Sequence, residues 1–279
     1  SRECLTVKNA IVNKTHGESR RATRMLGPGS APGYHPVMQD FHYRILEILS
    51  DAEFHSGETI ARRIGMSRGS VWHGVRKLES LGLTVYKVPR RGYRLSRRLS
   101  MLDQRCVSER VGGLVPPLTV RCIPEATSTN SLLMAEAGTG AAHGTVIATE
   151  HQSHGRGRQN RVWVAPLGGS LAVSVLWRFG KGPAALSGLS LAVGVAIVRA
   201  LRELGAVDVG LKWPNDVLWR GCKLAGTLIE VQGDALGPSA AVIGIGINVW
   251  LSDTDRGVID QPVTDLETVV GREIDRNQL

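Results

Sequence analysis

Apolar residues in the first hundred positions recur at intervals of three or four, and this spacing predicts helices at 45–49, 60–64 and 71–81. Serines stand where the second and third helices begin, and glycines where they end, as caps and stops usually do: Ser56, Gly65, Ser67 and Gly82. The short turn between these helices makes a helix-turn-helix. The next stretch, residues 85–95, is interrupted by a turn at 89–92 and predicts a β-hairpin wing.

Beyond residue 116 the pattern changes to short apolar runs separated by helical segments. The runs predict strands at 145–148, 169–177, 225–231 and 240–249, and the helical segments lie at 131–137 and 186–204. Strands and helices arranged in this way predict a mixed sheet covered by helices, which is an α+β architecture.

These changes of pattern divide the chain into four parts. Residues 1–37 are basic, contain a cluster of Gly, Pro and Ser, and are expected to form a disordered leader. Residues 38–98 are expected to form the winged helix-turn-helix domain, 99–116 a linker and 117–279 the α+β body. The body is long enough to bury a full hydrophobic core.

The longest uncharged run, residues 182–198, is short and polar for a membrane span, which needs ~20 apolar residues. Its apolar residues recur at helical spacing, so we expect a helix buried against the sheet. The first 24 residues lack the apolar segment of a signal peptide. The four cysteines have no metal-ligand or disulfide spacing, and His151 with His154 is too small a set for a metal site. A cytoplasmic protein without a membrane partner is expected.

Charge is distributed unevenly between the two halves of the chain. Residues 1–100 hold 18 Lys or Arg against 8 Asp or Glu, a net +10, and the remainder holds 16 against 17, a net −1. A basic domain joined to a near-neutral body is typical of nucleic-acid binding, although a basic domain that binds nothing specific is the alternative. The third helix and the wing carry the side chains expected to face DNA: Arg68, Ser70, His73, Arg76, Lys77, Lys87, Arg90, Arg91 and Arg94.

A glycine-containing loop at residues 155–163 carries the clearest chemical signal. Arg156, Arg158 and Arg161 lie on it, and it ends in Trp163. Glycines let the backbone approach oxygen atoms closely, and guanidinium groups form paired hydrogen bonds with phosphate. The loop is therefore suited to a nucleotide, and a solvated basic loop is the alternative.

Other segments accompany this loop: Ser-Thr-Asn at 128–130, Lys-Trp-Pro-Asn-Asp at 212–216, Lys-Leu-Ala-Gly at 223–226 and Gly-Ile-Gly-Ile-Asn at 244–248. In this order and spacing, the chain from Met38 onward resembles the biotin protein ligases. The basic domain resembles the DNA-binding module of the bifunctional biotin ligase and biotin operon repressors. One departure is Asn160, which stands where the family commonly has a third loop glycine and which tolerates positive φ better than other non-glycine residues.

The resemblance implies a catalytic sheet related to that of class II aminoacyl-tRNA synthetases. It also implies a small C-terminal SH3-like barrel, which this sequence, ending at Leu279, is expected to lack. The activity implied is ATP-dependent conversion of biotin to biotinyl-5′-AMP, followed by transfer to a lysine of the biotin carboxyl carrier protein of acetyl-CoA carboxylase, with Mg²⁺ accompanying ATP. The winged helix implies biotin-responsive repression at operator DNA by an adenylate-bound homodimer.

Two rival functions are a ligase for lipoate or octanoate and a transcription factor that senses a ligand without catalysis. The segment 212–216 and the arginine loop argue against the first rival. Lys223 together with the arginine loop argues against the second, because sensing alone does not need cations placed along the line of a reaction.

By resemblance, Arg156 and Arg158 hold the biotin carboxylate and the α-phosphate, and Lys223 bridges the reacting groups. Asp216 either binds Mg²⁺ or orients the acceptor lysine. The glycines of the 244–248 segment are expected to leave room for the biotin ring, Trp163 to cover adenine with Asn215 and Asn248 at its polar edge, and Trp213 and Pro214 to pack in the core. The full biotin set is Ser128, Thr129, Asn130, Gln152, Gly155, Arg156, Gly157, Arg158, Lys223, Gly244 and Gly246, and the ATP set is Arg161, Trp163, Lys212, Asn215 and Asn248.

Overall fold

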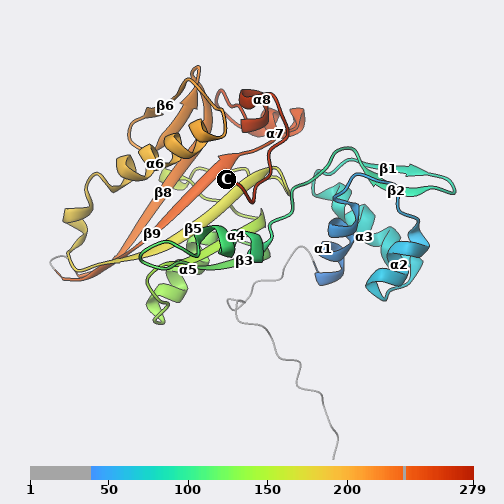
Figure 1. Ribbon diagram of the computed structural model, residues 1–279, viewed down its shortest axis with the longest axis horizontal. Helices are drawn as coiled ribbons and strands as arrows, with labels where there is room; N and C mark the ends of the chain where they lie inside the picture. Colours follow the sequence, from blue (N-terminus) through green and yellow to red (C-terminus); the bar gives the residue numbers. More distant parts are fainter. Residues whose placement is uncertain (1–38, 235–236) are drawn as a thin grey trace, which may run out of the picture.

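The computed structural model describes residues 39–234 and 237–279, so the expected leader at 1–37 lies outside the described residues. A small helical domain with a two-stranded hairpin precedes a larger domain built on a seven-stranded sheet (Figure 1). The expected α+β architecture with an N-terminal winged helix is confirmed.

The N-terminal domain follows the predicted pattern of caps. Its elements are α1 (Asp40–Leu49), α2 (Gly57–Ile64), α3 (Arg68–Ser80), β1 (Val85–Val88) and β2 (Gly92–Leu95). Ser56 and Ser67 each accept a hydrogen bond from a backbone amide of the helix that they precede, and Gly65 ends α2 at φ 70°. The inward-facing apolar residues of all three helices form one buried cluster, so the predicted helix-turn-helix and wing are confirmed.

The larger sheet has the strand order β3-β4-β5-β9-β8-β7-β6, in which β3 and β4 are parallel and all other neighbours are antiparallel. The predicted strands correspond to β4, β5, β8 and β9, whereas β3, β6 and β7 had no separate prediction. The bounds are β3 (Thr119–Ala126), β4 (Thr145–Gln152), β5 (Ser170–Phe179), β6 (Val209–Lys212), β7 (Asp216–Trp219), β8 (Cys222–Gly233) and β9 (Ser239–Asn248).

Two helices cover opposite faces of this sheet: α5 (Thr129–Gly138) and α6 (Leu189–Glu203). Val242 of β9 packs in the cluster that contains α5, and Ile247 packs in the cluster that contains α6. Residues an odd number apart on a strand point to opposite faces, so the α5 face and the α6 face are distinct. The remaining helices are α4 (Gln104–Val111), within the expected linker and against β3, then α7 (Asp253–Val258) and α8 (Leu266–Val270).

The segment Pro183–Glu203 is long and apolar enough to cross a membrane by length and composition, with a mean hydropathy of 1.9. The uncharged run itself ends at Val198, because Arg199, Arg202 and Glu203 follow it within α6. The expected packing of one face of this helix against the sheet is confirmed. Ile197 and Leu201 are buried in the core, whereas Leu191 and Val195 are each 40% exposed on the outer side.

The two domains share buried apolar packing. Leu167, which follows the arginine loop in the larger domain, is 2% exposed and belongs to the core cluster of the N-terminal domain. Gly168 lies against Leu99 so closely that a Cβ there would lie 3.1 Å from the leucine side chain. The linker is therefore packed between the two domains.

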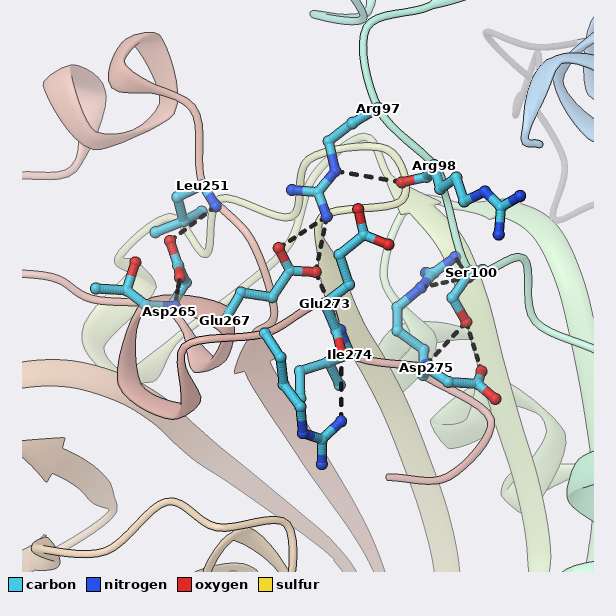
Figure 2. A network of polar contacts seen from close by, with 12 residues as sticks. Arg97, Arg98, Ser100, Leu251, Asp265, Glu267, Glu273, Ile274 and Asp275 are labelled. Atoms are coloured by element: carbon cyan, nitrogen blue, oxygen red, sulfur yellow. Dashed lines mark hydrogen bonds and ion pairs between the residues drawn. The ribbon is translucent and has the colours of Figure 1, made fainter. Parts of the chain in front are cut away.

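Polar contacts reinforce this junction (Figure 2). Arg97 Nη2 lies 2.7 Å from both carboxylate oxygens of Glu267, and Ser100 Oγ donates to Asp275 Oδ1 at 2.6 Å. Arg276, which is 2% exposed, pairs with the buried carboxylate of Glu150 and donates to the carbonyl of Ser100. A buried arginine is stable only when its donors are satisfied, so these contacts fix the segment after α8 against the linker.

Candidate active site

A cavity of about 390 Å³ opens on the α5 face of the sheet, a volume suited to a small-molecule ligand. Glycines stand where β8 and β9 pass beneath it: Gly226 pairs with Gly246, and Gly244 pairs with Leu228. A Cβ on Gly244 would lie 2.2 Å from Asn130 Oδ1, and one on Gly246 would lie 2.4 Å from the Trp163 ring. Gly244 and Gly246 both line the cavity, and their lack of side chains lets Asn130 and Trp163 lie close to the strand. The expected room for the biotin ring beside these glycines stays a prediction.

The floor of the cavity is a network of neutral polar groups at the start of α5. Ser128 caps the helix, and the amide of Thr129 donates to Gln152 Oε1 at 2.8 Å. Ser174 Oγ, on β5, lies 2.7 Å from Thr129 Oγ1 and 2.6 Å from Asn130 Oδ1. All of these side chains except the half-buried Gln152 are buried, and they are mutually oriented, so they can direct hydrogen bonds to an uncharged polar ligand group.

The arginine loop has a fixed base and a strained tip. Gly157 N donates to Arg161 O at 2.7 Å, and Trp163 N donates to Gly155 O at 2.9 Å. At the tip, Gln159 and Asn160 have φ values of 56° and 57°. Asn160 thus adopts the positive φ that its residue type was expected to tolerate, and Gln159 does so without that prediction. Gly155 does not line the cavity, and a Cβ there would lie 2.4 Å from the Trp163 carbonyl oxygen.

Basic side chains surround the cavity from three separate segments. Arg156 pairs with Glu230 at 2.8 Å, and Lys223 pairs with Asp216 at 2.8 Å. Among the described residues, no carboxylate lies within 4.0 Å of the other three cations. The cavity therefore retains an excess of positive charge, which suits a polyanion. The five cations are Arg156, Arg158, Arg161, Lys212 and Lys223.

The backbone of Lys223 is held on both sides. Its amide donates to the carbonyl of Pro262 at 2.9 Å, and its carbonyl accepts from Thr264 N at 3.0 Å. Asn248 Nδ2 donates to the carbonyls of Lys223 and Thr264, at 3.4 and 3.1 Å. Asn248 is 2% exposed and does not line the cavity, so its expected role at the adenine edge is corrected: it fixes the segment that presents Lys223.

Four residues that line the cavity have distinct surroundings. Trp163 lies over Gly226 and Gly246, and its buried indole Nε1 has no hydrogen-bond partner among the described residues. Trp213 is 77% exposed and lines the cavity with Pro214, so the expectation that both pack in the core was wrong. Asn215 accepts a hydrogen bond from Arg158 Nη1 at 3.4 Å, which joins the loop to the segment before β7.

Asp216 supplies the one carboxylate among the described residues that line the cavity. Its oxygen is engaged by Lys223, and the described residues contain no cluster of three His, Cys, Asp or Glu side chains able to hold a metal. Mg²⁺ commonly binds through one carboxylate together with substrate phosphates. The donor set therefore fits a metal that arrives with a nucleotide.

The structure places the predicted DNA-facing residues on two neighbouring elements. Arg68, on α3, and Arg90, at the wing tip, line a shared groove together with Trp72. Trp72 was missed because it falls outside the basic pattern, yet its side chain is 44% exposed and lies beneath the Arg76 guanidinium at 5.6 Å. Most of the predicted side chains are exposed, whereas Ser70, Lys77 and Arg94 are half-buried, and Arg94 stacks on Phe54 and Tyr86.

Comparison with known proteins agrees with both sites. A model of the Biotin/lipoate A/B protein ligase family matches residues 122–248, and a model of the HTH domain matches residues 42–94. The chain is 37% identical to the bifunctional ligase/repressor BirA of Salmonella typhimurium over 235 residues, which are 84% of this chain and 72% of that protein. It is 32% identical to the BirA of Bacillus subtilis, over 83% of this chain and 72% of that protein.

A further relative is the biotin–[acetyl-CoA-carboxylase] ligase of Mycobacterium tuberculosis, 39% identical over 56% of this chain and 58% of that protein. The solved structure of the biotin protein ligase from Leishmania major in complex with biotin covers 58% of this chain and 70% of its own, with 26% identity and a TM-score of 0.48. The relationship to the BirA proteins extends through the helix-turn-helix and the cavity alike. This chain belongs to the family of bifunctional ligase/repressor BirA proteins.

Proposed function

We propose that this chain joins biotin to ATP, releasing pyrophosphate and forming biotinyl-5′-AMP, and then transfers the biotinyl group to a lysine of a biotin carboxyl carrier protein. The observation that carries the proposal is the pairing, in one cavity, of a neutral polar floor with five surrounding cations. The floor suits a ureido group, and the cations suit a carboxylate and a triphosphate that would otherwise repel each other. Lipoate, whose ring lacks the ureido group, would offer the floor groups fewer hydrogen-bonding partners.

In the first step, an oxygen of the biotin carboxylate attacks the α-phosphorus, and the bond to the β-phosphate bridging oxygen breaks. Lys223, whose backbone is bonded on both sides, is placed to stabilise the charge that develops there. Arg158 and Arg161 would contact phosphate from the loop, and Mg²⁺ bound to the nucleotide would offset its remaining charge, with Asp216 as the protein carboxylate available to hold it.

In the second step, the acceptor lysine amine attacks the acyl carbon and AMP leaves. Trp163 and Arg156, at the base of the loop, line the cavity, so an adenylate bound there would be shielded from water on that side. The amine must arrive uncharged, and Asp216 is the cavity carboxylate available to orient it once Lys223 is engaged with phosphate.

The winged helix supports the second activity, which is repression at operator DNA. Arg68 and Arg90 line one groove, which matches a helix in the major groove and a wing on the phosphates. We propose that adenylate formation promotes a homodimer that spans two half-sites, because a dimer doubles the phosphate contacts.

The test of the ligase is incubation of the chain with labelled biotin, ATP, Mg²⁺ and a carrier domain, with adenylate and labelled protein measured separately. The expected result is ATP-dependent adenylate followed by one labelled lysine on the carrier. Absence of adenylate with biotin, or equal adenylate with lipoate in its place, contradicts the proposal.

A further inference from the structure

Glu230 is a charged residue in the otherwise apolar stretch of β8 from Leu224 to Val231, apart from Thr227. It lies on the same face of the sheet as the cavity glycines, because it is an even number of residues beyond Gly226. Its carboxylate does not line the cavity, yet Oε2 lies 2.8 Å from Arg156 Nη2 and 2.9 Å from Asn130 Nδ2. One carboxylate thus contacts both the loop and the floor.

We propose that Glu230 is a positioning residue that fixes the base of the arginine loop relative to the ligand-binding floor, and thereby sets how tightly the enzyme retains its substrate and its activated product. This inference rests on the proposed ligase function. Glu230 acts through Arg156 and Asn130 and does not itself contact the ligand.

On the floor side of this contact, both polar atoms of the Asn130 side chain have hydrogen-bond partners. Asn130 Nδ2 donates both to Glu230 and to the Leu228 carbonyl, and its Oδ1 lies 2.6 Å from Ser174 Oγ. Asn130 is 3% exposed, so an unsatisfied amide there would be costly. Glu230 therefore helps to determine which way the Asn130 amide faces the cavity.

On the loop side, one backbone contact and one side-chain contact hold Arg156. The backbone of Arg156 bridges to Val162 across the base of the loop, and its side chain ties that base to β8 through Glu230. The tip carries Arg158, and it has no comparable ion pair to the sheet among the described residues. Holding the base leaves Arg158 and Arg161 available for phosphate while limiting how far the loop can open.

Simple electrostatics and positioning predict opposite effects when the charge of Glu230 is removed. Without a negative charge beside Arg156, the cavity becomes more positive, and bound anions should be held more tightly. If Glu230 positions Arg156, losing that charge frees the loop and anions should be held less tightly. Glu230→Gln separates the two because glutamine keeps an acceptor for Asn130 and nearly the same size.

The test measures KM for biotin, kcat for adenylate synthesis and the dissociation rate of biotinyl-5′-AMP in the full chain carrying Glu230→Gln. Loss of one charge-assisted contact should raise KM and the dissociation rate about tenfold while kcat changes less than about threefold. Glu136→Gln is the matched control, because Glu136 forms a similar ion pair with Arg121 at 2.6 Å outside the cavity. Unchanged or tighter binding overturns the proposal.

A second readout does not depend on activity. Trypsin cleaves after arginine, so opening of the loop should speed cleavage at Arg158 and Arg161 in Glu230→Gln and leave the Glu136→Gln variant like the wild type. Glu230→Asp, which retains charge with a shorter reach, should recover part of the protection. If the wild type makes no adenylate, the ligase proposal fails, and equal cleavage rates in all variants would separately overturn the role of Glu230.

Discussion

The cations around the cavity and those on the outer surface of the winged helix differ in how they are held. In the cavity, Arg156 and Lys223 each pair with a carboxylate at 2.8 Å. Of the nine residues predicted to face DNA, Lys87 alone has a carboxylate within 4.0 Å among the described residues, namely Glu79. The cavity fixes two of its five cations through ion pairs, one of them the Lys223 proposed to act in the reaction, whereas the DNA-facing surface leaves most of its charges without a carboxylate partner in the described part of the chain.

This difference indicates how each surface works. A reaction needs a cation at one defined point, so moving or removing it should cost much of the rate. Binding to a phosphate backbone depends on the number of neutralised phosphates, so each basic residue should contribute a small and similar part. The expected results below decrease in size in that order.

The largest effect is expected for Lys223→Ala. Loss of one positioned cation at a developing charge should lower the rate of adenylate synthesis by about a hundredfold or more, without unfolding the protein. The measurement is pyrophosphate release with biotin and ATP, with Lys181→Ala as an exposed control outside the cavity. Near-normal adenylate synthesis in Lys223→Ala would remove this residue from the mechanism.

Arg158→Gly should act on the adenylate after it has formed. Arg158 lies at the loop tip and joins it to Asn215, so its loss should let the adenylate dissociate about tenfold faster. Transfer to the carrier should slow, and labelling of unrelated lysines should increase. An adenylate dissociation rate equal to that of the wild type would contradict this role, and Arg199→Ala, on the exposed side of α6, is the control.

Arg90→Ala should weaken DNA binding only modestly. With one phosphate contact fewer, affinity should fall about threefold at fixed salt, and the slope of log affinity against log salt should fall by about one. The loss should be similar on any duplex sequence. A loss confined to one sequence would show that Arg90 reads bases and that the two surfaces differ less than proposed.

The smallest effect is expected at the domain junction under acid. Burial raises the pKa of Asp275, but hydrogen bonds from Ser100, Asn277 and Gln278 together outweigh it and lower that pKa below its ordinary 3.8. The stability that this carboxylate contributes is therefore present above pH 3.8 and is lost as the pH falls through the lower folded-state pKa. The melting temperature of Asp275→Asn should approach that of the wild type over this range, and a difference independent of pH would contradict the assignment.

Local signals in the sequence predicted much of the fold. Ser56, Ser67 and Gly65 define helix ends by contacts within a few residues, so their roles could be inferred directly. The surroundings of Gly246 and Asn248 depend on which distant segments pack against β9, and the contacts of Gly246 with Trp163 and of Asn248 with Thr264 were not predicted. Patterns within a few residues do not indicate which distant segments pack together.

Two residues at the site were missed from the sequence. Ser174 is an ordinary small polar residue within β5, and only its position opposite Gly244 brings it to Asn130. Glu230 did leave a signal, because a carboxylate in an apolar strand must find a partner. The sequence did not indicate that Arg156 is that partner.

We propose that biotinyl-5′-AMP made in the cavity controls the DNA affinity of the winged helix. The most direct measurement is a titration of the full chain against a two-fold symmetric duplex, which the chain itself selects from a randomised pool, with and without biotin plus ATP, at several salt concentrations. Tighter binding and a steeper salt dependence are expected when adenylate is present, because dimerisation adds a second set of phosphate contacts. Identical affinity and identical salt slope in both conditions would contradict it.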